Sequence, residues 1–178
     1  MTDPFDEIIG GLDAPKARTL ALVLTPVVSA PALAGLASIG KISCTVVPTP
    51  MGAVATTVVE ADPFAALSGE IPNEARGLAV AMASLSRTEV VLVLVELAGD
   101  AETGLGYEGN TTAYRVTTDG LGDAVSAGLL LANADPVVED LVTGEVLPAD
   151  APGALETDSI PRAQALEMIR RGSRRPRS

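Results

Sequence analysis

Three carboxylates follow the most apolar segment of the chain and are the first candidates for chemistry. Glu96 interrupts the run VVLVLVEL near its end, and Asp100 and Glu102 come shortly after it. In α/β sheets, functional residues gather at the carboxyl ends of strands, where this run ends. Carboxylates there could hold Mg²⁺, or one could act as a general base. The alternative is that Glu96 is an ordinary exposed glutamate at a strand end.

Two glycine-containing strings come close to nucleotide-binding motifs. The string GLASIGKI (35–42) is near a phosphate-binding loop, but Ile42 stands where the motif needs a hydroxyl for magnesium, and the order of strand and helix is reversed. The string GLGYEG (104–109) fits G-x-G-x-x-G and follows an apolar run. Its third glycine should open a helix, whereas the next residues are β-branched and favour a strand. We therefore interpret the first string as a helix end with Gly40 as C-cap, and the second as a hairpin connection.

Few other residues of this chain could act as nucleophiles or bind a metal ion. The sequence contains no histidine and a single cysteine, Cys44, in an apolar segment. Zinc sites built on thiolates, Ser-His-Asp triads and Cys-His pairs are thereby excluded. Cys44 is expected to be a small buried side chain, because no imidazole is present to generate its thiolate. No catalytic residue, no cofactor and no metal ligand is assigned.

Charge is segregated along the sequence. Residues 1–160 hold 22 acidic and 6 basic side chains, a net charge of −16, whereas residues 161–178 hold 1 acidic and 6 basic ones, a net charge of +5. A basic terminus of this kind acts through its charge, on nucleic-acid phosphate, on anionic lipid, on an acidic protein or on its own acidic body. The candidate electrostatic residues are Arg170, Arg171, Arg174, Arg175 and Arg177.

Length and composition predict one domain with a sizeable core. The chain has 178 residues, 47% of them hydrophobic, and only 2% aromatic, so the core is built from Ala, Val and Leu. Residues 19–40 carry no charge and raise the alternatives of a membrane span or a signal sequence. Pro26, Pro31 and the acidic segment before Lys16 favour a strand, a turn and a helix of a buried core instead. We expect a soluble, cytoplasmic, acidic protein.

Periodicity and turn residues predict an alternation of short helices and strands around one mixed β-sheet. The apolar run that ends in Glu96 is expected to be a central strand covered on both faces. A helix over 73–87 has Asn73 as its expected N-cap, and residues 123–132 are left open between strand and helix. The other expected helices cover 3–11, 30–40, 62–69, 136–144 and 161–171, and the other strands 21–28, 41–48, 53–61, 88–99 and 111–118; residues 148–160 are expected to be a loop.

An internal pattern raises the hypothesis of a duplication. Both phenylalanines lie in Asp-Pro-Phe, at 3–5 and 62–64, and each is followed at similar spacing by a related string, ARTLA (17–21) and ARGLA (75–79). Two half-domains over about 3–60 and 62–120 would explain the pattern. The alternative is that Asp-Pro is a common helix start and that the second string is common in an Ala-rich chain.

These observations predict an α/β (mixed α+β) fold in which residues 1–160 form a single acidic domain and residues 161–178 a helix with an Arg-rich tail. The leading hypothesis is a non-enzymatic protein-interaction or regulatory module, because motifs for catalysis fail in their context. Its expected partner is an unknown protein or a second copy of the chain, and no membrane is expected to be involved. The alternatives are a small Mg-dependent enzyme using Glu96, Asp100 and Glu102, and a nucleic-acid-associated protein acting through the arginines of the tail.

Overall fold

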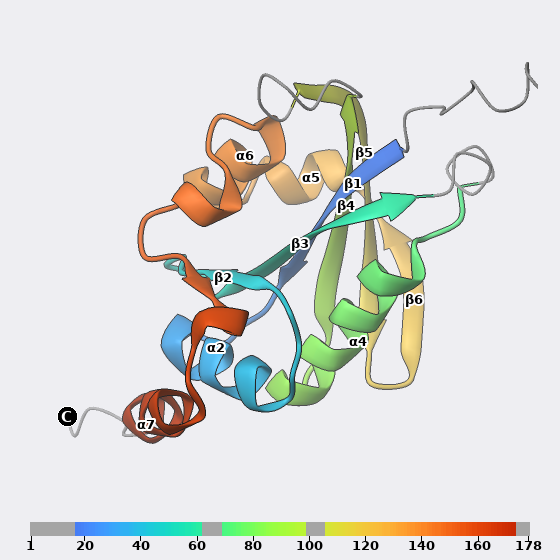
Figure 1. The fold of residues 1–178 in the computed structure, drawn as a ribbon. Helices are drawn as coiled ribbons and strands as arrows, with labels where there is room; N and C mark the ends of the chain where they lie inside the picture. The colour runs from blue at the N-terminus through green and yellow to red at the C-terminus, as the bar shows by residue number, and fades with distance from the viewer. Residues whose placement is uncertain (1–16, 62–68, 99–105, 174–178) are drawn as a thin grey trace, which may run out of the picture.

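The computed structural model describes residues 17–61, 69–98 and 106–173, which form one compact unit of strands and helices (Figure 1). This confirms the mixed α and β fold class. The short helices expected over 3–11 and 62–69 lie outside the described residues, except for Gly69. The strands are β1 (Ala17–Leu24), β2 (Thr45–Val47), β3 (Val54–Ala61), β4 (Val90–Ala98), β5 (Gly106–Thr117), β6 (Gly120–Val125) and β7 (Leu155–Glu156). The α-helices are α2 (Ala30–Ile39), α4 (Asn73–Ser86), α5 (Ala127–Leu131), α6 (Pro136–Thr143) and α7 (Arg162–Gly172).

The seven strands form one sheet in the order β6-β5-β4-β1-β3-β2-β7. Every strand pair among the described residues is antiparallel, so the mixed sheet expected from the sequence is in fact antiparallel. The first strand, β1, is central and pairs with β3 on one side and β4 on the other. In such a sheet the carboxyl ends of neighbouring strands lie at opposite edges, which removes the argument that placed a site at the end of β4.

Both faces of the central strands are covered, as expected for β4. Alternate residues of β1 and β4 contribute to two separate cores: Ala21, Val23 and Leu92 to one, Leu22 and Val93 to the other. Helices α2 and α4 cover the first face, with α7 packed against α2, and α5 with α6 cover the second face (Figure 1). Small aliphatic side chains suffice to fill these layers because the sheet is covered on both sides.

The apolar stretch 19–40 forms most of β1 and the whole of α2, and no helix of the described residues is long and apolar enough to cross a membrane. β1 ends at Leu24, earlier than expected, because Pro26 lacks an N–H for the ladder. The hydroxyl of Thr25 donates to the carbonyl of Ala53 at 2.7 Å, which fixes the turn. Ser29 then caps α2 by accepting from the N–H of Ala32.

Helix α7 packs against α2. Ala165 is fully buried and Met168 is partly buried, whereas Leu166 is 54% exposed. The hydroxyl of Ser38 in α2 donates to the carbonyl of Ile160 at 3.0 Å, just before α7 begins. The helix of the basic terminus is therefore held against α2.

Four further expectations can be compared with the described residues. Residues 123–132, left open, divide into the end of β6 and helix α5, while the loop expected over 148–160 contains the short strand β7. Helix α4 begins at Asn73, with Pro72 in the cap position and no side-chain cap. The strings ARTLA and ARGLA lie in β1 and α4 respectively, so they do not occupy equivalent elements, and the duplication remains unconfirmed.

Candidate functional site

The structure places Glu96 near the end of β4 but does not assemble the expected carboxylate cluster. Its side chain is exposed, and the β4–β5 pairing is irregular between Val95 and Leu97. Asp100 and Glu102 lie outside the described residues. Within the described ranges, no three His, Cys, Asp or Glu side chains are grouped so that they could hold a metal ion. The magnesium site therefore remains a prediction.

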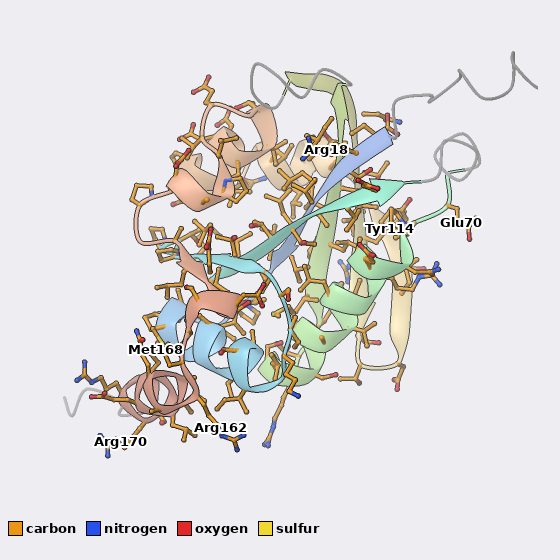
Figure 2. The ribbon with its side chains drawn as sticks, viewed as in Figure 1. Arg18, Glu70, Tyr114, Arg162, Met168 and Arg170 are labelled. Atoms are coloured by element: carbon orange, nitrogen blue, oxygen red, sulfur yellow. The ribbon has the colours of Figure 1, made fainter. Side chains whose placement is uncertain are left out.

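Glu96 borders a small polar pocket of about 100 Å³ on the α4 side of the sheet. Glu70 and Tyr114 also line it, and Figure 2 shows both beside the N-terminal end of α4. Thr19 and Thr112 complete its polar lining from β1 and β5. A water molecule takes up about 30 Å³ in the liquid, so this volume suits a few waters or a very small ligand.

Neither glycine string has the local structure of a nucleotide-binding motif in the part of the chain that the structure describes. Residues 35–40 belong to α2 and its C-cap Gly40, whose N–H donates to the carbonyl of Leu36. The left-handed backbone position after the helix is taken by Lys41, with φ of 57°. In the second string, Gly106 already begins β5, so Gly109 lies within a strand and opens no helix. The hairpin connection is thus shorter than expected.

Cys44 is a buried thiol held beside Thr157. Burial raises the pKa of Cys44 to about 11, with a smaller upward effect from Asp158 and a partial offset from the hydrogen bond to Thr157. The thiol is therefore protonated at neutral pH, which suits a packing role and not a nucleophile. Thr157 accepts from the N–H of Cys44 at 2.9 Å and donates to the carbonyl of Ile42 at 2.7 Å.

The described part of the basic terminus lies on the outer surface of α7. Arg170 and Arg171 are exposed in its last turn, and Figure 2 shows Arg162 and Arg170 extending away from the body. Arg171 bonds Glu167 one turn earlier at 2.5 Å. Arg174, Arg175 and Arg177 lie outside the described residues, so an electrostatic role of the tail remains a prediction.

A much larger pocket lies at the other end of the sheet, on the face covered by α5 and α6. We call it the α5 pocket; its volume is about 810 Å³. Leu24, Val54 and Val91 form its floor at the ends of three central strands, since they lie on the same face as the second core. Its walls comprise Pro26, Met51, Gly52, Glu89, Arg115, Val125, Ser126, Leu129, Leu130, Asn133, Asp135 and Val138.

The polar groups of the α5 pocket are largely occupied by local structure. The hydroxyl of Thr49 donates to the carbonyl of Gly52 at 2.5 Å. Ser126 and Asp135 cap α5 and α6 by accepting from the N–H groups of Leu129 and Val137. The pocket as a whole therefore presents mainly aliphatic surface to a ligand, and not a set of converging catalytic groups.

The rim of the pocket is apolar and open to solvent. Leu129 is 70% exposed and Met51 is 69% exposed. Helix α5 has the sequence AGLLL, yet none of its residues is fully buried. Arg115 and Glu89 form the polar side of the rim, with 3.7 Å between a guanidinium nitrogen and a carboxylate oxygen. Leu130 and Leu131 of α5 pack partly against the second core, so the exposed apolar surface of this helix is mainly that of Leu129.

Sequence reasoning missed the α5 pocket because its lining comes from six separate segments. One local signal was present: three consecutive leucines at 129–131, followed closely by the capped helix α6. Leu130 and Leu131 pack partly against the second core, whereas Leu129 stays at the surface.

A scan against protein-family models matches no family, and comparisons with curated proteins and with solved structures give no match.

Proposed function

We propose that the chain is a protein-interaction module that binds a partner protein at the α5 pocket. The observation that carries the proposal is the exposed apolar rim, with Leu129 and Met51 standing beside an aliphatic pocket. Exposed apolar surface next to a concavity is typical of sites that another protein covers.

The apolar rim is large enough to contribute measurable affinity. Full burial of a Leu or Met side chain is worth about 1.5–3 kcal/mol, and Leu129 and Met51 both remain more than two-thirds exposed. A partner that covers both and inserts a side chain over Leu24 and Val91 would gain a few kcal/mol from these contacts. That gain is of the size found for the central residues of protein interfaces.

A small-molecule site is the main competing interpretation, since pockets of about 300–1,000 Å³ commonly hold small ligands. A ligand enclosed in the α5 pocket would leave the outer faces of Leu129 and Met51 in water. A partner protein can cover the pocket and its rim together. The protein-interaction reading therefore accounts for more of the exposed apolar surface.

Site-specific photo-crosslinking tests the proposal. Benzoylphenylalanine is placed at position 129 in the full chain, in the cells that produce the protein, and the crosslinked peptides are identified by mass spectrometry. The matched control has it at Leu166 of α7, an exposed leucine outside the pocket.

We expect a defined polypeptide, another protein or a second copy of the chain, to be crosslinked at position 129 and not at position 166. If neither position yields a crosslinked polypeptide, or if both yield the same set of products, the α5 pocket is not a protein-binding site. If only position 129 crosslinks, and only to a small molecule, the competing interpretation is correct.

A further inference from the structure

The charges around the α5 pocket indicate what kind of protein segment it binds. We propose, on the basis of the function proposed above, that the partner presents a segment in which apolar side chains are flanked by Lys or Arg. The apolar residues would occupy the pocket, and the basic residues would lie against an acidic rim.

The acidic rim is formed by three carboxylates. Asp135 lines the pocket itself, at the start of α6. Glu139 lies one helical turn later on the same face of α6, because residues four apart are neighbours on a helix. Asp123 lies two residues before the pocket residue Val125, at the irregular part of the β5–β6 pairing that lies opposite Arg115. Asp123 and Glu139 are exposed.

The opposite charge is scarce in the same region. Among the described residues, the charged side chains that line the pocket are Glu89, Asp135 and Arg115. Arg115 is paired with Glu89. The charges left at the pocket are those of Asp135 and of the exposed carboxylates near it, which attract cations and repel other carboxylates.

A second copy of the chain fits this rim poorly. Each copy carries a formal net charge of −11, so two bodies repel one another. The basic end of the chain, GSRRPRS (172–178), contains arginines but no large apolar side chain to fill the pocket. The charge and the pocket together favour a different protein with a basic and apolar segment.

The test uses two fluorescent peptides of defined composition. The first is a short peptide of Leu and Lys with helical periodicity, and the second has Glu in place of every Lys. Binding of each to the full chain is measured by fluorescence anisotropy at low and high salt. We expect the Leu/Lys peptide to bind at least about tenfold more tightly than the Leu/Glu peptide, with the difference shrinking at high salt.

Matched variants locate the binding. Leu129→Ser should weaken the Leu/Lys peptide about tenfold, and Leu166→Ser, the same change on α7, should leave it unchanged. The pair Asp123→Asn and Glu139→Gln should weaken it about fivefold. The pair Glu70→Gln and Glu74→Gln, just before and on α4 at the other face of the sheet, removes the same charge elsewhere and should have no such effect.

The outcomes separate this inference from the function proposed above. If both peptides bind equally and Leu129→Ser weakens each of them, the claim that the partner segment is basic is wrong, but the pocket still binds protein. Crosslinking of position 129 to a second copy of the chain would also overturn it. If the chain prefers the Leu/Lys peptide but the two pairs of charge-removing substitutions weaken binding equally, the peptide is attracted by the whole acidic body and not by the rim. Failure of both peptides to respond to Leu129→Ser would count against the pocket itself.

Discussion

Gly35 of α2 is the position where the packing of α7 can be tested with a single methyl group. A Cβ on Gly35 would lie 2.7 Å from the carbonyl oxygen of Ala165 and 3.2 Å from Cγ1 of Ile169. Ordinary contact begins at 3.4 Å, so Gly35→Ala must displace α7 by roughly 0.7 Å in a closely packed interior. The oxygen belongs to the backbone of α7, so no side-chain rotation can relieve the overlap.

The magnitude follows from two opposing effects. Overpacking of this kind costs about 1–3 kcal/mol, whereas replacing a glycine inside a helix by alanine stabilises it by about 1 kcal/mol. Gly35→Ala should therefore lower the free energy of unfolding by about 0–2 kcal/mol. Gly77→Ala in α4 is the matched control, because a Cβ there meets nothing within 4 Å; that variant should be more stable by about 1 kcal/mol.

Urea unfolding followed by far-ultraviolet circular dichroism measures both variants, since the chain has no tryptophan. The two should differ by about 1–3 kcal/mol, or by several degrees in Tm at about 2–4 °C per kcal/mol for a chain of this size. If Gly35→Ala stabilises the protein as much as Gly77→Ala, α7 is not held against α2 as described.

Three further predictions concern single positions. Lys41→Gly should raise the free energy of unfolding by about 1 kcal/mol in urea, because Lys41 has φ of 57°. Burial raises the pKa of Cys44 from 9.0 to about 11; between these values only the unfolded thiol ionises, so the free energy of unfolding should fall by about 1.4 kcal/mol per pH unit. Cys44→Ala should abolish this fall in the free energy of unfolding at alkaline pH. Near neutral pH, where the thiol is protonated in both states, the substitution should not change the pH dependence of unfolding. Gly52→Ala should lower Tm far more than Gly120→Ala, since both have positive φ but only the first would overlap Thr25; equal losses would contradict this.

Much of the local structure could be predicted because its causes are local. Periodicity and capping residues were sufficient to predict α2, α4 apart from its cap, and α6. In α6 the expected cap forms, since Asp135 accepts from the N–H of Val137. The run of Val and Leu up to Glu96 was sufficient for β4 and for its coverage on both faces. These elements depend on residues a few positions apart, which a single sequence displays directly.

The remaining features depend on contacts between distant segments. Nothing near β1 indicates that it pairs with both β3 and β4, and this antiparallel order is what removes the site expected at Glu96. The α5 pocket is likewise formed where the ends of β1 and β4 meet the β2–β3 turn and α5. The docking face of α7 also depends on a distant segment, because Ala165 and Leu166 are adjacent in sequence and only the position of α2 decides which is buried.

The closing of the sheet by β7 has a consequence for synthesis on the ribosome. β7 pairs with β2, and Thr157 bonds the backbone at Ile42 and Cys44, 115 and 113 residues earlier in the chain. During elongation, β2 therefore emerges long before the strand that completes its edge, and an unpaired edge is a template for aggregation. The shortness of β2, three residues, limits that risk, and a chain that ended before Leu155 would keep the edge open permanently.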